Sequence, residues 1–237
     1  MSPQEPTARH NLQFYQCSNP ECGLRFPGPL KARVDPMVCP RCQSPVQVVP
    51  TRPQIEEYNP RNLAGPDNPR LEVLLDNIRS TFNVGAMLRT SDGAGVAHVH
   101  LCGITPQPGN PRIAKVALGA EFSVPWTYHP SAIQAVQECK TRGLKVWALE
   151  IHPDTHSIFE IPPEITAQTA VLVVGNEVSG IDPAIHELCD DFFWIPMQGY
   201  KRSLNVAVAF GIAVYTLRSG ALSNRQNLDP GERSKLK

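Results

Sequence analysis

Three polar clusters follow apolar runs of the sequence, and each contains residue types that could bind or orient a reacting hydroxyl group. Amides and hydroxyls donate and accept hydrogen bonds, a carboxylate accepts them, and a guanidinium binds anionic oxygens. The clusters are Asn83-x-Gly85-x3-Arg89, Gly175-Asn176-Glu177-x2-Gly180, and the pair Ser203 and Asn205. Because the carboxyl ends of parallel strands meet at one crevice, clusters at strand ends are expected to converge on a ligand site.

Each cluster also has a purely structural interpretation. Asn83 and Ser203 could be helix N-caps, Arg89 and Glu177 could form a surface pair, and the glycines could merely end strands. A single cluster would favour this interpretation, but three clusters, each at a strand end, favour a binding site. The commonest NAD and ATP sites are disfavoured, because residues 175–180 lack a P-loop signature and no G-x-G-x-x-G follows a strand.

A second group of residues with metal-binding chemistry lies near the start of the chain. Cys17-x4-Cys22 and Cys39-x2-Cys42 each bracket a turn, so the two turns could present four thiolates to a tetrahedral zinc ion. A closed four-cysteine site has a structural role and would stabilise a module too small for its own core. Two disulfides or four unrelated thiols are the alternatives. The spacing resembles a zinc ribbon, although ribbons usually have two residues inside the first pair.

The elements that must position these residues are predicted from apolar periodicity. Buried strands are expected where apolar runs are bounded by turn residues, at 71–76, 96–103, 145–150, 170–175 and 192–197. Helices are expected at 83–93, at 131–143 with Ser131 as N-cap, and from about Ser203 onward. Continuous apolar strands that alternate with helices predict an α/β fold with a mostly parallel sheet.

Composition divides the 237 residues into parts. Of 24 prolines, 13 lie in the first 70 residues together with four of the seven cysteines. This composition distinguishes the first 70 residues from the part of the chain with alternating predicted strands and helices. We therefore expect a flexible terminus at 1–13, a zinc-ribbon-like module at 14–49, a proline-rich linker at 50–70, a large domain at 71–220 and a basic tail at 221–237.

The formal net charge is zero, but the charge differs by region. It is +1 over residues 1–60, −4 over 61–215 and +3 over 216–237. This balance excludes only indiscriminate, charge-driven binding to nucleic acid. The chain has no long apolar run and no apolar segment near its start, and its cysteine number is odd. We therefore expect no membrane span and a cytoplasmic protein.

The three clusters together resemble the motifs of the SpoU (TrmH-type) RNA 2′-O-ribose methyltransferase family. The third motif is the most specific, with Ile195-Pro196-Met197 followed by Ser203-Leu204-Asn205-Val206-Ala207-x-Ala209. A fourth, less specific motif of the family resembles the stretch from Lys115 to Pro125. The resemblance covers about residues 71–219. It implies a trefoil-knotted α/β domain, a homodimer, and S-adenosylmethionine as the methyl donor.

The resemblance also implies roles for individual residues. Arg89 would act on the ribose 2′-hydroxyl as the base, although a guanidinium stays protonated, so binding the adjacent phosphate is the alternative role. The frame around the ribose would consist of Asn83, Glu177, Ser203 and Asn205. The cofactor would contact Leu172, Val174, Gly175, Asn176, Gly180, Ile195, Met197, Ser203 and Leu204. Candidate phosphate contacts are Arg79, Lys115, Lys201 and Arg202, each of which could instead be a solvated loop charge.

The sequence therefore predicts an enzyme that methylates a ribose 2′-hydroxyl of tRNA or rRNA, with the cysteine module assisting RNA capture. A non-catalytic RNA-binding protein on the same scaffold is one alternative. Methylation of a base instead of the ribose is another. The presence of all polar motif positions favours the ribose methyltransferase.

Overall fold

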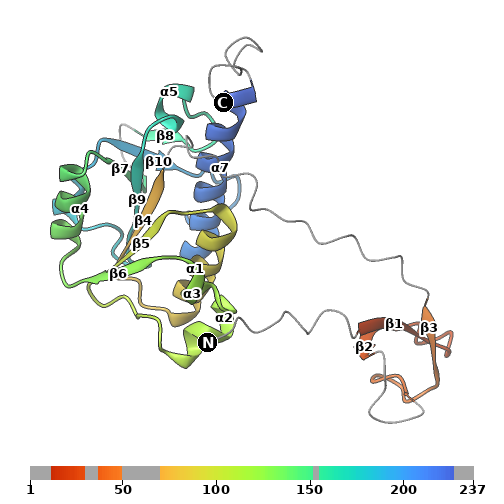
Figure 1. Cartoon of the computed structure of the whole chain (residues 1–237). Helices are drawn as coiled ribbons and strands as arrows, with labels where there is room; N and C mark the ends of the chain where they lie inside the picture. Colours follow the sequence, from red (N-terminus) through yellow and green to blue (C-terminus); the bar gives the residue numbers. More distant parts are fainter. Residues whose placement is uncertain (1–11, 30–36, 50–69, 152–154, 227–237) are drawn as a thin grey trace, which may run out of the picture. The chain divides into compact units, whose positions relative to one another are not determined.

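The computed structural model describes residues 12–29, 37–49, 70–151 and 155–226 (Figure 1). The chain divides into two compact units, Met1–Arg61 and Asn62–Lys237. The expected terminus at 1–13, linker at 50–70 and tail at 221–237 lie largely outside the described residues, so these boundaries stay predictions. Within the described part of the chain, no helix is long and apolar enough to cross a membrane.

The smaller unit contains a three-stranded antiparallel sheet in the order β2-β1-β3. Its strands are β1 (Leu12–Cys17), β2 (Arg25–Pro29) and β3 (Val46–Val49). Tyr15 on the central strand is buried, stacks against Phe26 with ring centroids 5.9 Å apart, and donates a hydrogen bond to the Pro29 carbonyl. Together with the buried Cys17 and Cys39, it forms the small interior of this unit.

The larger unit is built on a seven-stranded sheet in the order β6-β5-β4-β9-β7-β10-β8, and every neighbouring pair is parallel. The strands are β4 (Leu71–Asp76), β5 (His98–Cys102), β6 (Trp126–His129), β7 (Lys145–Leu149), β8 (Thr155–Ser157), β9 (Ala170–Val174) and β10 (Asp191–Trp194). This arrangement confirms the predicted mostly parallel α/β fold.

Helices cover both faces of this sheet (Figure 1). They are α1 (Thr81–Ala94), α2 (Pro111–Ala117), α3 (Ala120–Ser123), α4 (Ala132–Thr141), α5 (Pro163–Thr166), α6 (Pro183–His186) and α7 (Val206–Gln226). In β4, Val73 and Leu75 pack into the core with α1 and α7, whereas Leu74 packs on the α4 side. Because both faces are buried, the central strands β4 and β9 are buried along their whole length; β9 is apolar throughout, and β4 is apolar apart from the buried Glu72 and Asp76.

Most predicted elements form, with differences at their ends. Ser131 caps α4 as predicted, since its hydroxyl accepts from the Gln134 N–H. The expected strand 192–197 ends at Trp194, and the expected helix from Ser203 begins only at Val206. Asn205 accounts for that later start, because its side chain accepts from the Ala207 N–H at 2.9 Å and so occupies the capping position. The trefoil knot implied by the family resemblance remains a prediction.

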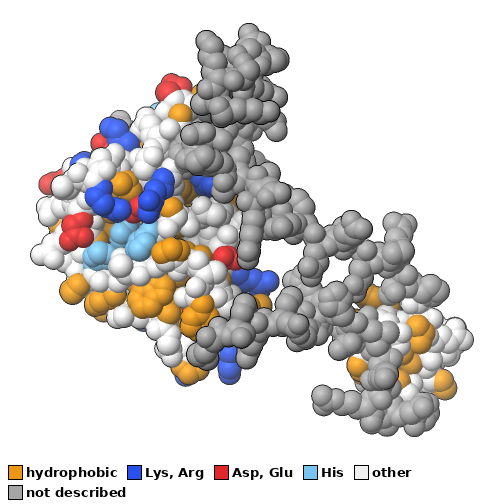
Figure 2. Space-filling view, in the orientation of Figure 1, with side chains coloured by type: hydrophobic (Ala, Val, Ile, Leu, Met, Phe, Trp, Pro, Cys, Tyr) orange, Lys and Arg blue, Asp and Glu red, His pale blue; other side chains and the backbone are white. Residues whose placement is uncertain are grey.

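A charge cluster around the buried Glu72, formed with His100 and Arg142, joins β4, β5 and the end of α4. The fully buried Glu72 carboxylate accepts two hydrogen bonds from Arg142, at 2.6 and 3.0 Å, and one from His100 Nε2 at 2.9 Å. Figure 2 shows histidine side chains beside Lys and Arg side chains on the surface of this unit. Arg70 Nε also lies 3.1 Å from Glu72 Oε1, so three cationic side chains compensate for the burial of this carboxylate at the amino-terminal end of β4.

The pKa values of this cluster follow from those contacts. Burial alone would lower the pKa of His100, but its contacts with Cys139 and Glu72 raise it from 6.5 to about 9. Burial alone would raise the pKa of Glu72, but hydrogen bonds from His100 and Arg142 lower it to about 2. His100 is therefore an imidazolium at neutral pH, and its Nδ1 donates to His129 Nε2 at 3.0 Å.

Replacing His100 with Asn should lower the free energy of unfolding near neutral pH by about 1.5–3 kcal/mol, the range for hydrogen bonds to charged groups. Since the folded-state pKa is raised, the stabilisation by His100 is complete below pH 6.5 and is lost as the pH rises through about 9. Urea unfolding at about pH 7 and about pH 10 should therefore show a smaller difference between wild type and variant at the higher pH.

The matched control is His98→Asn on the same strand, because burial lowers the pKa of His98 and keeps it neutral over this interval. Its difference from wild type should stay constant from about pH 7 to about pH 10. A constant difference for His100→Asn as well would contradict the assignment of a charged His100.

Candidate functional site

The Glu177 carboxylate connects two of the three polar clusters. Its Oε2 accepts from the Arg79 N–H at 3.0 Å, and its Oε1 accepts from the Ser80 N–H at 3.2 Å and from Asn83 Nδ2 at 3.0 Å. Ser80 is the N-cap of α1, and its hydroxyl accepts from the Asn83 N–H. A carboxylate from the loop after β9 thus completes the amino-terminal cap of α1, where the helix dipole also favours negative charge.

The pKa of Glu177 is lowered by this environment. Burial would raise it, but hydrogen bonds from the Arg79 backbone and from the Asn83 side chain outweigh that effect. Glu177 is therefore ionised at neutral pH and accepts hydrogen bonds only. The Asn83 amide accordingly points its Nδ2 at Glu177, which leaves its Oδ1 available to accept a hydrogen bond. No ion pair joins Glu177 to Arg89 within the described residues, so the surface-pair interpretation is wrong.

The loop that carries Glu177 is closed on itself. The backbones of Asn176 and Gly180 exchange two hydrogen bonds, at 2.9 and 3.0 Å, and Gly180 has a φ of +74°. A Cβ on Gly175 would collide with the backbone of Gly180 and Ile181. The Asn176 side chain then ties this loop to the end of β4, because its Nδ2 donates to the Asn77 carbonyl at 2.7 Å.

The third cluster joins the same group through Asn205. Its Nδ2 donates to Asn83 Oδ1 at 3.2 Å, while its Oδ1 caps the first turn of α7. The three clusters, separated by about 120 positions in the sequence at most, therefore form one hydrogen-bonded chain from Glu177 through Asn83 to Asn205. The expected convergence of these clusters is thus observed in the structure.

A cavity of about 470 Å³ opens beside this chain at the carboxyl ends of β7, β9 and β10. Its volume lies within the range of small-molecule sites. Its wall combines apolar side chains with a few polar ones and includes Leu149, Glu150, Ile151, Val174, Gly175, Asn176, Glu177, Val178, Gly180, Phe193, Trp194, Ile195, Met197, Arg202, Ser203, Leu204, Asn205, Val206 and Ala209. An apolar cavity with convergent amides and a carboxylate can hold an amphiphilic ligand.

Eight of the nine residues predicted to contact a cofactor line this cavity; the exception is Leu172, which is fully buried in the core of the sheet. Sequence reasoning missed the segment from Leu149 to Ile151, at the carboxyl end of β7. Glu150 fixes the loop opposite, because its Oε2 accepts from the Ile181 N–H at 2.9 Å. Polar residues at the carboxyl ends of predicted strands identified the other parts of the site. The same criterion could have identified Glu150, since the apolar run 145–150 also ends in a polar residue.

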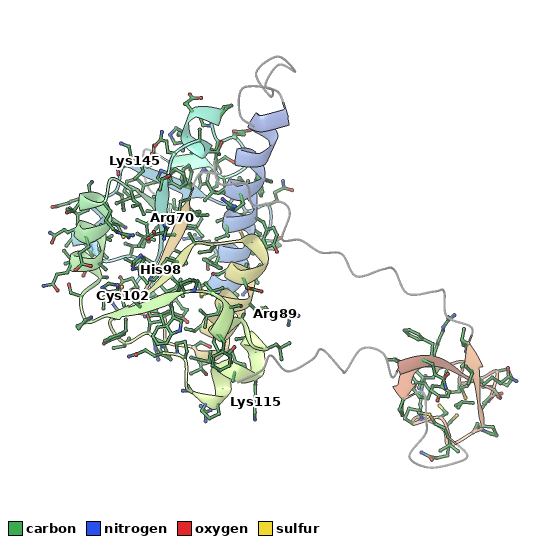
Figure 3. All side chains as sticks on the ribbon, in the orientation of Figure 1. Arg70, Arg89, His98, Cys102, Lys115 and Lys145 are labelled. Carbon is green, nitrogen blue, oxygen red and sulfur yellow. The ribbon has the colours of Figure 1, made fainter. Side chains whose placement is uncertain are left out.

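Arg89 and the predicted phosphate contacts are more widely spread. Arg89 lies two turns beyond Asn83 on α1, is exposed, and does not line the cavity (Figure 3). Lys115 is exposed on α2, away from the three clusters in the sequence (Figure 3). Arg79 and Lys201 are exposed in the loops that carry the first and third clusters, and Arg202 lines the cavity.

The four clustered cysteines lie together in the smaller unit. Their Sγ atoms are within 4.8 Å of one another, with 3.5 Å between Cys17 and Cys42 and 3.8 Å between Cys22 and Cys39. These separations exclude disulfides, whose sulfur atoms are about 2.05 Å apart. They agree with about 3.8 Å, the edge of a tetrahedron with Zn–S bonds of about 2.3 Å.

Both cysteine loops use the same backbone device despite their different lengths. Each turns through a residue with positive φ directly after its second cysteine, which is Gly23 in the first loop and Gln43 in the second. The Gly23 N–H donates to the Asn19 carbonyl, and the Gln43 N–H donates to the Cys39 carbonyl. The two extra residues in the first pair therefore leave the sulfur atoms in position.

Comparison with known proteins bears on the larger unit. The sequence matches the SpoU rRNA Methylase family over residues 70–215. A 23S rRNA (guanosine(2553)-2′-O)-methyltransferase of Bacillus subtilis is 35% identical over 63% of this chain and 58% of its own length. A tRNA (guanosine(18)-2′-O)-methyltransferase of Thermus thermophilus is 34% identical over 68% of this chain and 83% of its own.

Solved structures agree with this match. The AdoMet-bound rRNA methyltransferase from Sinorhizobium meliloti superposes with a TM-score of 0.60 at 25% identity, over 73% of this chain and 62% of that one. The family match spans more than half of the chain and contains all three polar clusters. From these clusters, the cavity beside them and the match, the chain belongs to the SpoU rRNA methylase family.

Proposed function

We propose that this protein is an S-adenosylmethionine-dependent methyltransferase that acts on a ribose 2′-hydroxyl of tRNA or rRNA. The observation that carries the proposal is the convergence of Asn83, Glu177 and Asn205 beside the cavity at the carboxyl end of the sheet. The names of the Bacillus and Thermus relatives support both the reaction and the two classes of RNA.

The cavity fits the proposed cofactor. When bound, S-adenosylmethionine supplies a methyl group on a positively charged sulfur, which an oxygen nucleophile can attack in line. Apolar side chains such as Ile151, Ile195 and Leu204 would pack on its adenosine part and exclude water. Glu150 and Glu177 both place carboxyl groups in the cavity wall, which favours a cationic ligand.

The polar chain beside the cavity would orient the ribose. Glu177 and Asn205 both hold the Asn83 amide, so its position is set before substrate arrives. Ser203 and Asn205 are exposed at the mouth and can donate hydrogen bonds to sugar oxygens. Alignment of hydroxyl and methyl donor is the main requirement of such a transfer, and a fixed polar frame supplies it.

Arg89 would bind the phosphate beside the target hydroxyl and orient that hydroxyl, because the planar fork of a guanidinium matches phosphate oxygens. Within one protomer it lies outside the cavity, so we propose that a homodimer completes the site. Exposed apolar side chains support this assembly: Phe122 on α3 is 88% exposed, and Val208 and Tyr215 on α7 are also exposed. Both helices pack on α1, the helix that carries Arg89.

RNA would be held near the site by a few placed cations. Arg79, Lys201 and Arg202 are exposed in the loops around the cavity and are proposed as phosphate contacts, with Lys115 as a contact farther along the RNA. For the smaller unit we propose a structural zinc ion on Cys17, Cys22, Cys39 and Cys42, on the basis of the sulfur separations. The three cysteines outside the cluster, Cys102, Cys139 and Cys189, are free thiols, which supports a reducing, cytoplasmic compartment.

The reaction is tested with labelled S-adenosylmethionine and unmodified tRNA and rRNA, followed by nucleoside analysis. Label is expected in a 2′-O-methylribose. Arg89→Ala should reduce transfer by at least about 100-fold through lost positioning while cofactor binding stays within about twofold of wild type. The control Arg112→Ala, which removes an exposed arginine outside the three clusters, should retain activity. Label in a base, no label in either RNA, or equal loss of transfer and cofactor binding in Arg89→Ala would each contradict this proposal.

The zinc site is tested by elemental analysis of the whole chain. Wild type should contain one zinc ion per chain, and the Cys39→Ser/Cys42→Ser variant should contain none, because two thiolates cannot complete the tetrahedron. The control Cys189→Ser, outside the cluster, should keep its zinc. A metal-free wild type, or a double variant that retains zinc, is incompatible with the proposed site.

A further inference from the structure

Among the described residues of the smaller unit, no core packs against one face of its sheet. Phe14 on the central strand β1 lies directly opposite Pro27 of β2 and Val49 of β3, so these three side chains share a face. Phe14 is 42% exposed and Pro27 is exposed. We call this surface, completed by Arg25 and Gln47, the Phe14 face.

The opposite face already contains the interior of the unit. Tyr15 pairs with Phe26 and Val48, and Cys17 pairs with Val46, so the buried tyrosine and the cysteine cluster lie on that side. The exposed ring of Phe14 is therefore not needed to cover the metal site. A large aromatic side chain in the middle of a small sheet, open to solvent, is typical of a binding surface.

The chemistry of the Phe14 face matches an unpaired nucleotide. The Arg25 guanidinium carbon lies 5.8 Å from the centroid of the Phe14 ring, so a cation and an aromatic plane are presented together. Arg25 and Gln47 flank Gln16 across the strands and add donors at the border of the apolar patch. Glu21, the single acidic residue in the described part of this unit, lies in the first cysteine loop and off the strands.

We propose that the Phe14 face binds single-stranded RNA by stacking one base on Phe14, with Arg25 against the base or its phosphate. This inference rests on the proposed function, since it assigns the RNA contact of the smaller unit. Single-stranded RNA is the fitting partner because its bases can leave the stack and expose a π-face, whereas duplex bases cannot. The contact is insensitive to sequence, because every base has such a face.

The test measures binding of a labelled oligouridine to the whole chain by fluorescence anisotropy. Phe14→Ala should weaken binding by roughly tenfold, the lower part of the range for loss of one base–aromatic stack. Phe14→Tyr should bind within about twofold of wild type because it keeps the ring. The matched control is Val48→Ala, which truncates an exposed apolar residue on the opposite face and should also bind like wild type.

A second measurement is independent of affinity. In Phe14→Trp, oligouridine should quench the new tryptophan emission beyond any change seen in wild type, and duplex RNA should not. Zinc content of each variant reports whether the unit is folded. Wild-type affinity in Phe14→Ala, or no quenching in zinc-loaded Phe14→Trp, overturns the inference and means that another part of the chain or a protein partner covers this face.

The outcome is distinguishable from a failure of the proposed function. Wild-type transfer to RNA together with wild-type binding by Phe14→Ala would leave the methyltransferase proposal standing and remove only this surface. Absence of transfer by wild type, with oligouridine binding that depends on Phe14, would have the opposite meaning.

Discussion

The arrangement of the site depends on one carboxylate. In a capping box, the N3 residue of the same helix reaches back to the N-cap N–H. In α1 the N3 residue is Asn83, and Glu177 from a loop 97 positions farther along the chain accepts from the Ser80 N–H instead. Removing this acceptor would leave backbone N–H groups without their partner, at a cost of about 0.5–2 kcal/mol by analogy with helix caps. The interaction that stabilises the helix end is thus the one that brings the first two clusters together.

The sheet gives this carboxylate its place. β9 lies between β4 and β7, so the loop after β9 stands directly beside the loop that begins α1. Both faces of the sheet are covered by helices, which fixes the strands firmly and leaves the carboxyl edge for binding. The amino-terminal end of β4 has a different role, since the buried Glu72 pairs there with His100 and with Arg142, whose guanidinium reaches the surface.

Much of this architecture could be predicted from the sequence, because local patterns determine it. Strand β4 coincides with the predicted run 71–76, and Ser131 caps its helix as predicted. The strand order could not be predicted, since periodicity does not say that β9 inserts between β4 and β7.

The contacts that depend on this strand order could not be predicted either. The Glu177 cap was not foreseen for this reason, and Glu150 was missed although it is the last residue of a predicted strand. Leu172 does not line the cavity because it lies two residues before the carboxyl end of β9, on the same face as Val174 but deeper in the core. The placement of Arg89 outside the cavity depends on how α1 packs against the sheet, which no local pattern contains.

The central claim is that the three clusters build a single cofactor site. The most direct measurement is a crystal structure of the protein with S-adenosylhomocysteine, the product of methyl transfer. The account predicts that the ligand occupies the cavity at the carboxyl ends of β7, β9 and β10, between the loop 175–180 and Leu204, with its sulfur facing the Asn83–Asn205 pair. A ligand bound elsewhere on the chain, or an empty cavity at saturating ligand, would contradict it.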